Sequence, residues 1–246
     1  MRIAFFADVH GNREALTACL DHAAHARIDR YAFLGDYVGY GADPVFVVET
    51  VMAHAQRGAI AILGNHDAAA LVPDPLMSGI ATAAIDWTRG QLSADHAAFL
   101  RALPLSSEDD GRLYVHASAD DPAAWHYVTN ADAASRCLAA TTARAIFCGH
   151  THVPALFHQS ATGRTAAFTP HAGIDIPLTA GRRWLATIGS VGQPRDHNPA
   201  ACYAVLDTAA ATLTYVRVPY DIDTAARKID DAGLPRALSE RLYAGW

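Results

Sequence analysis

Five short segments of this 246-residue chain place metal-binding side chains directly after an apolar run. The runs IAFFA, YAFL, AIAIL, LYV and AIFC each indicate a buried β-strand. Open α/β sheets place their ligand sites at the carboxyl ends of their strands, so the polar residues are expected together at that edge. The segments are Asp8-Val9-His10-Gly11-Asn12, Gly35-Asp36, Gly64-Asn65-His66-Asp67, Val115-His116 and Gly149-His150-Thr151-His152. Because they supply only Asp, Asn and His, they predict one site that holds two metal ions.

The spacing within two of these segments suggests how the side chains converge. Residues i and i+2 of a strand point to the same side, so Asp8 with His10 and His150 with His152 are each expected to present two ligands to one pocket. Asp36 stands alone at its strand end and is the natural bridging ligand, because a carboxylate can bind two cations through its two oxygens. Mixed nitrogen and oxygen ligation favours manganese, iron, zinc or cobalt over calcium or magnesium.

A pair of such ions predicts a reaction. Two ions about 3.5–4 Å apart generate a bridging hydroxide near neutral pH and clamp the oxygens of an in-line phosphoryl displacement. The hydroxide is expected to attack phosphorus, while a protonated group near the leaving oxygen assists its departure. The expected partner is therefore a small phosphorylated substrate.

Charge and cysteine usage exclude several other partners and sites. The net charge of −6, from 19 basic and 25 acidic residues, provides no basic surface for specific nucleic-acid binding. No apolar run resembles a signal peptide or reaches membrane-spanning length, which predicts a cytoplasmic protein without a membrane partner. The four cysteines lack a C-x-x-C pair, so we expect reduced structural thiols rather than disulfides or a sulfur-bound zinc.

The hydrophobic pattern predicts a single α/β domain over residues 1–246. Strands and helices alternate up to Leu63, an order that favours a parallel sheet with right-handed crossovers. An alanine-rich helical pattern over about 68–103 predicts a small helical insert. Strands dominate beyond Gly111, and strands followed by short helices are expected over about 184–246.

The combination D-x-H-G-N, G-D, G-N-H-D, a strand-terminal His and G-H-x-H resembles the calcineurin-like metallophosphoesterase superfamily. The resemblance continues through residues 189–196 and the tail Val218-Pro219-Tyr220-Asp221. Within the superfamily, the chain is most similar to the small bacterial phosphodiesterase and diadenosine-tetraphosphatase-like members. The resemblance implies a four-layer α/β/β/α sandwich of two facing sheets, which agrees with the strand-rich second half.

The resemblance also implies a role for individual residues. It makes His66 the general acid or phosphate-contacting histidine, places Asn12 at the mouth of the site, and gives Asp67 a loop-holding role. Arg195 is a candidate for phosphate contact, with a purely structural loop arginine as the alternative. The implied ligands are Asp8, His10, Asp36 and His152 for one metal and Asp36, Asn65, His116 and His150 for the other.

Two positions depart from the protein phosphatases of this superfamily. Where those enzymes have G-D-x-V-D-R-G, this chain has Gly39 in place of the second Asp and Tyr40 in place of the Arg. Without that carboxylate His66 should be less strongly held as an imidazolium, and without that guanidinium a dianionic monoester loses a bidentate partner. We therefore expect hydrolysis of phosphodiester or phosphoanhydride bonds in nucleotide-like substrates, with Tyr40 available to a base or ribose.

Several alternatives remain open at this point. The chain could be a phosphomonoesterase or a Ser/Thr protein phosphatase of the same superfamily, or a non-catalytic scaffold that keeps the fold. The insert is expected to cap the site, with a dimer contact in a homo-oligomer as the alternative. Trp125 and Tyr127 could stack on a base or pack their own loop. Manganese is the ion expected to support activity best.

Overall fold

The computed structural model describes residues 1–75, 77 and 79–246, and within them the strands form two mixed six-stranded sheets. The first sheet contains β1 (Arg2–Phe6), β2 (Arg30–Phe33), β3 (Ile60–Ala61), β9 (Asp175–Pro177), β11 (Ala201–Asp207) and β12 (Thr212–Val218), in the order β3-β2-β1-β11-β12-β9. The second contains β4 (Ser106–Asp109), β5 (Arg112–Val115), β6 (Ala145–Cys148), β7 (Ala155–Gln159), β8 (Thr165–Phe168) and β10 (Arg183–Thr187), in the order β4-β5-β6-β10-β7-β8.

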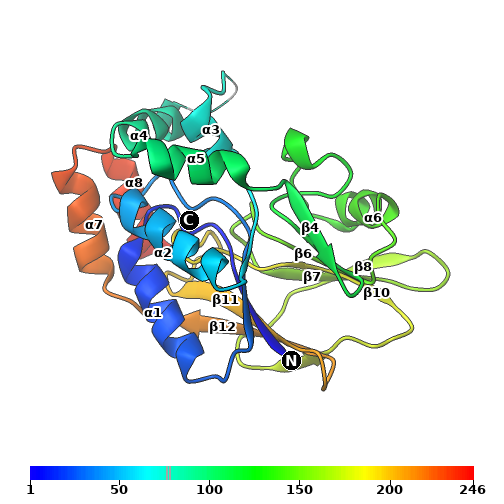
Figure 1. The fold of residues 1–246 in the computed structure, drawn as a ribbon. Helices are drawn as coiled ribbons and strands as arrows, with labels where there is room; N and C mark the ends of the chain where they lie inside the picture. Colours follow the sequence, from blue (N-terminus) through cyan, green and yellow to red (C-terminus); the bar gives the residue numbers. More distant parts are fainter. Residues whose placement is uncertain (76, 78) are drawn as a thin grey trace.

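Helices cover the outer face of each sheet (Figure 1). Helices α1 (Arg13–Ala24) and α2 (Pro44–Gln56) pack on the first sheet, with α7 (Ile222–Asp231) and α8 (Arg236–Ala244) beside them. Helix α6 (Ala131–Ala139) packs on the second sheet. The expected four-layer α/β/β/α sandwich is therefore confirmed.

The middle of the sandwich is an apolar layer shared by the two sheets. Phe5 of β1 stacks on Phe147 of β6 with ring centroids 4.2 Å apart, and Tyr114 of β5 packs beside both rings. Each is fully or almost fully buried, and burying an aromatic side chain contributes about 1.5–3 kcal/mol. This contact fixes the central strands of the two sheets against each other.

The central strands position the site. Strands β1, β2 and β3 pair in parallel in the first sheet, and β5, β6 and β10 do so in the second. The carboxyl ends of parallel strands lie at one edge of their sheet, and here the loops that leave both sheets converge. The parallel sheet predicted for the first part of the chain is confirmed, although antiparallel β11 and β12 complete it.

The predicted insert is helical, but it begins earlier than expected. Helix α3 (Asn65–Leu71) starts three residues before Ala68 and is followed by α4 (Gly79–Arg89) and α5 (Ala94–Ala102). Asn65, His66 and Asp67 therefore lie on the first turn of a helix instead of in a loop. The chain's one lysine, Lys228 of α7, pairs with Glu14 and Asp43, and so ties the C-terminal helices to the layer of α1 and α2.

Four strands have no counterpart among the sequence expectations: β4, β7, β8 and β9. Strand β4 reads SSED and lies at the outer edge of its sheet, where a polar strand is tolerated. Strands β8 and β9 are edge strands as well, with largely exposed or half-buried residues. Such strands carry little of the apolar signal from which strands are recognised.

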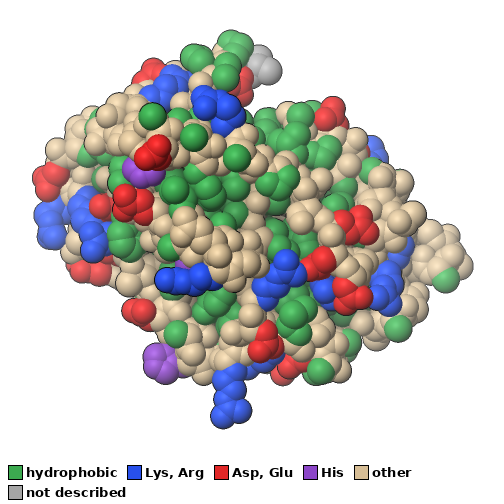
Figure 2. All heavy atoms as spheres, viewed as in Figure 1, with side chains coloured by type: hydrophobic (Ala, Val, Ile, Leu, Met, Phe, Trp, Pro, Cys, Tyr) green, Lys and Arg blue, Asp and Glu red, His purple; other side chains and the backbone are tan. Residues whose placement is uncertain are grey.

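The surface agrees with the charge balance of the sequence. On the face shown in Figure 2, lysine and arginine side chains are interspersed with aspartate and glutamate. None of the helices in the described ranges is long and apolar enough to cross a membrane.

Candidate metal centre

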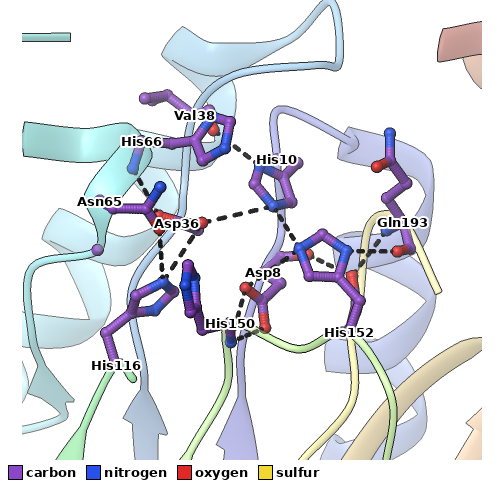
Figure 3. Close-up of polar contacts among 12 residues, drawn as sticks. Asp8, His10, Asp36, Val38, Asn65, His66, His116, His150, His152 and Gln193 are labelled. Carbon is purple, nitrogen blue, oxygen red and sulfur yellow. Dashed lines mark hydrogen bonds and ion pairs between the residues drawn. The ribbon is translucent and has the colours of Figure 1, made fainter. Parts of the chain in front are cut away.

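The predicted ligands converge in two groups that share one carboxylate (Figure 3). Every residue of both groups is buried. Within each group the ligand atoms lie within 4.8 Å of one another, and Asp36 belongs to both. Asn65 adjoins the second group, with its Oδ1 3.1 Å from His116 Nε2. The groups are Asp8, His10, Asp36 and His152, and Asp36, His116 and His150.

Backbone carbonyls fix the orientation of three of the imidazole rings. His10 Nδ1 donates to the carbonyl of Val38 at 3.0 Å, and His116 Nδ1 donates to that of Leu34 at 2.7 Å. His152 Nδ1 likewise donates to the Gln193 carbonyl at 2.6 Å. Because a carbonyl only accepts, each Nδ1 carries a proton. The neutral His10 and His152 therefore present the lone pair of Nε2 to the centre, and His116 does so once its Nε2 proton is lost. This is the tautomer in which a histidine ligates a metal through Nε2.

The Nε2 atoms of three histidines at the centre face no hydrogen-bond donor among the described residues. The Nε2 atoms of His10 and His152 lie 3.0 Å apart, so two lone pairs face each other. His150 Nε2 is buried and has no hydrogen-bond partner. A cation at each of these places would turn repulsion and an unpaired acceptor into ligation. The residues present therefore fit a pair of divalent ions.

The backbone conformation that brings the ligand side chains together differs from the expected one. Asp8, His10, Asp36, His150 and His152 all have positive φ angles, between 49° and 66°. They lie beyond the ends of β1, β2 and β6, so strand alternation does not orient them. Left-handed loop conformations aim the side chains instead. His150 and His152 belong to different ligand groups that share Asp36, as the family resemblance implied.

Burial keeps four histidines of the centre neutral. It is the largest cause that lowers the pKa values of His10, His66 and His152, and it lowers that of His150 to about 3. The neutral imidazole is the form that binds a metal, so no proton must be removed before ligation.

Asp36 and His116 form the charged pair of the centre. Burial by itself raises the pKa of Asp36, but the nearby His116 and His66 hold that pKa well below its usual value. Burial likewise lowers the pKa of His116, but Asp36 outweighs it and raises this pKa to about 9. Burial raises the pKa of Asp8 to about 8, and a cation bound beside a carboxylate favours its ionised form.

Asp67 holds the loop that carries Asp36 through hydrogen bonds to the loop backbone. Its carboxylate accepts hydrogen bonds from the backbone N–H groups of Asp36 at 2.8 Å, Tyr37 at 2.9 Å and Val38 at 3.2 Å. It also accepts from the N–H of Gly64 at 3.0 Å. The side chain is fully buried beneath the loop that carries Asp36. The structure therefore gives Asp67 the loop-holding role that was expected.

Sequence comparison places this centre in a family. Residues 1–211 match the calcineurin-like phosphoesterase superfamily domain. The chain belongs to this superfamily. It is also 34% identical over 249 residues to an uncharacterized protein of Methanocaldococcus jannaschii, a match that covers 99% of this chain and 98% of that protein. The family expected from the motifs is confirmed.

Solved structures agree with the family. A metallophosphoesterase from Sphaerobacter thermophilus is 38% identical and superposes with a TM-score of 0.89, over 100% of this chain and 99% of that one. A hypothetical protein from Pyrococcus horikoshii OT3 superposes with a TM-score of 0.80 at 21% identity, over 100% and 98% of the chains, and shows the shared fold. This chain is thus a metallophosphoesterase with a buried Asp/His cluster typical of a dinuclear metal site.

The metallophosphoesterase departs from the protein phosphatases at Gly39 and Tyr40, as its sequence indicates. His66 is 5% exposed, and its Nδ1 is buried without a hydrogen-bond partner, so no described residue takes the part of the missing carboxylate. The ring of Tyr40 lies 4.5 Å from that of His66 and 4.6 Å from that of His10. An aromatic ring therefore occupies the motif position that is an arginine in those phosphatases.

The other two predicted substrate contacts lie at the edge of the centre. Asn12 is 4% exposed and caps α1: its Oδ1 accepts from the Ala15 N–H at 3.0 Å, and its amide donates to the Gly192 carbonyl at 2.9 Å. A substrate contact by Asn12 stays a prediction. Arg195 is half-buried, donates to Gln193 Oε1 at 3.1 Å, and has its guanidinium carbon 5.7 Å from the centre of the Tyr40 ring.

Sequence reasoning missed the groups that orient the ligands. The carbonyls of Leu34, Val38 and Gln193 carry no side-chain signature, so no motif could have marked them. Two aromatic residues also touch the ligands: Tyr127 stacks on His150 with centroids 4.0 Å apart, and Trp125 meets His116 edge-on at 5.8 Å.

Proposed function

We propose that this metallophosphoesterase hydrolyses phosphodiester or phosphoanhydride bonds of small nucleotide-like molecules at a dinuclear centre. The proposed ligands are those named from the sequence, with Asp36 bridging and Asn65 in the second group. When bound, two such ions supply a nucleophilic hydroxide near neutral pH and clamp the oxygens of the reacting phosphoryl group. Manganese is the ion we expect to support activity best, because the donor set mixes imidazole with carboxylate.

The chain's own residues bind and orient the substrate. His66 projects from the first turn of α3 toward the centre and is the proposed proton donor to the leaving oxygen. Since burial lowers its pKa, only a small fraction of His66 is protonated near neutral pH, and it suits leaving groups that need little protonation. Arg195 is proposed to pair with a non-bridging oxygen, and the Tyr40 ring to exclude water beside His66.

The single observation that carries the diester assignment is the surroundings of His66. A dianionic phosphomonoester requires more positive charge than a monoanionic diester, and the protein phosphatases supply it through the arginine that is Tyr40 here. The histidine Nδ1 also lacks a carboxylate partner. Both features favour a substrate with less charge and a better leaving group.

A substrate comparison tests this assignment. We expect kcat/KM for bis-p-nitrophenyl phosphate and diadenosine tetraphosphate to exceed that for a phosphoserine peptide. Tyr40→Arg should shift the ratio toward the peptide, whereas Tyr40→Phe, which keeps the ring, should leave it unchanged. A wild-type preference for the peptide would assign the enzyme to the phosphomonoesterases and would leave the metal centre intact.

A further inference from the structure

A pocket of about 440 Å³ adjoins the second ligand group. Its walls come from the start of the insert and from the loop that contains the short helix η1 (Pro122–Ala124), and we call it the insert pocket. Residues that line it include Asn65, Ala68, Leu71, Pro73, Arg101 and Trp125. These residues belong to α3, the segment that follows it, α5 and the loop that precedes α6.

Two contacts join the insert pocket to the metal centre. Asn65 lines the pocket and at the same time holds its Oδ1 3.1 Å from His116 Nε2. Trp125 also lines the pocket, with its ring centre 5.8 Å from that of His116. The insert pocket therefore lies next to the second ligand group.

The chemistry of the walls selects a flat, largely apolar group. Ala68, Leu71 and Pro73 provide apolar surface, and the half-buried Trp125 provides an aromatic face. The lining also includes the exposed Arg101, a hydrogen-bond donor and a cation, and the half-buried Asp74, an acceptor. The volume lies within the range of ligand pockets. A nucleobase matches this combination, since every base has a π-face for stacking and polar edges for a donor.

The backbone of Trp125 adopts an uncommon conformation. Trp125 ends η1 in the left-handed conformation, with a φ of 55°, which a large side chain rarely adopts. The neighbouring aromatic residue is less suitable: one face of Tyr127 is covered by His150, with a tilt of only 19° between the rings. Trp125 is the aromatic side chain that lines the insert pocket, whereas Tyr127 lines a separate pocket with Thr151 and Val153.

We propose that the insert pocket binds the nucleobase of the substrate, stacked on Trp125, while the phosphate lies at the metal centre. The inference rests on the proposed function for the position of that phosphate. It gives the insert a specific task, which is to form one wall of the base site.

The test compares two ligands that differ only in the base. Binding of AMP and of ribose 5-phosphate to manganese-loaded protein is measured by titration calorimetry, which needs no turnover. We expect AMP to bind more tightly, and Trp125→Leu to weaken AMP about tenfold while changing ribose 5-phosphate by less than about twofold. Trp125→Phe, which keeps an aromatic face, should retain most of the preference for AMP. Tyr127→Leu is the matched control and should keep it entirely.

Three results would overturn the proposal. The first is that the wild type binds AMP and ribose 5-phosphate equally well. The second is that Trp125→Leu weakens the binding of both ligands equally at unchanged metal content. The third is that Tyr127→Leu, and not Trp125→Leu, loses the preference for AMP. None depends on catalysis. A base site can therefore be present in a protein that fails to hydrolyse diesters, and a working diesterase can lack one.

Discussion

Five candidate ligands adopt a left-handed backbone conformation: Asp8, His10, Asp36, His150 and His152. This conformation disfavours residues with a Cβ by roughly 1–2 kcal/mol each. The hydrogen bonds beneath the loops offset that strain: the Asp8 carboxylate accepts from the His150 N–H, and that of Asp36 accepts from the His66 N–H at 2.8 Å. Strain held by the surrounding fold is common at functional sites.

Gly39 provides a prediction at the residue scale. Its φ is +82°, and an added Cβ would lie 2.5 Å from His66 Nδ1. Gly39→Ala should therefore combine left-handed strain with a displaced His66, and lower the free energy of unfolding by about 2–4 kcal/mol, as judged by denaturant titration. Gly58→Ala is the control, since Gly58 has a φ of +91° and nothing within 4 Å. It should show the strain alone, about 1–2 kcal/mol. Equal losses would show that His66 does not occupy the space beside Gly39.

The ligand types were predictable from the sequence, because each follows a strong apolar run. Their backbone geometry was not. The expectation that i and i+2 residues share a pocket assumes a strand, and a non-glycine residue such as His150 gives no sign that it adopts a positive φ. The backbone carbonyls that orient His10, His116 and His152 could not be predicted either, since every residue carries a carbonyl.

At the scale of elements, Asp67 joins the first turn of α3 to the loop after β2. Four backbone N–H groups donate to this one buried carboxylate. The helices and central strands were predictable because their apolar periodicity is strong. The start of α3 was placed too late, since its first turn consists of Asn65, His66 and Asp67, residues that also suit a loop.

Replacing the Asp67 carboxylate by an amide should weaken this connection between α3 and the loop after β2. In Asp67→Asn one carboxylate oxygen becomes an NH₂ group that cannot accept, so buried N–H groups lose their partner, at about 3 kcal/mol of unfolding free energy. Metal affinity should fall about 10–100-fold, because the loop carries Asp36. Asp221→Asn is the matched control: Asp221 caps α7 at an exposed position by accepting from the Thr224 N–H, and asparagine caps equally well. Wild-type stability and metal affinity in Asp67→Asn would contradict the holding role.

At the scale of the whole molecule, both sheets contribute ligands to the centre. Asp8, His10 and Asp36 follow strands of the first sheet, whereas His116, His150 and His152 follow strands of the second. Metal binding should therefore stabilise the complete sandwich. The one-domain interpretation of residues 1–246 stays a prediction that the same measurement addresses, since a single domain should unfold in one transition.

Thermal unfolding with and without metal measures this link. A ligand at a hundred times its Kd stabilises the native state by about 2.7 kcal/mol per site, and about 1 kcal/mol shifts Tm by about 2–4 °C for a protein of this size. Manganese added to chelator-treated protein should thus raise Tm by at least about 5 °C in one cooperative transition. Magnesium should raise it less, because it prefers all-oxygen ligation. An unchanged Tm with manganese would show that the ions do not bridge the two sheets.

Metal stoichiometry tests the dinuclear centre most directly, because Asp36 is the one carboxylate shared by both groups. Elemental analysis of manganese-loaded wild type should give close to two ions per chain. Asp36→Asn, which removes the bridging charge at nearly constant size, should retain fewer than one ion and lose more than about 100-fold in turnover of bis-p-nitrophenyl phosphate. A single ion per wild-type chain, or an Asp36→Asn variant with two ions and normal turnover, would contradict the account.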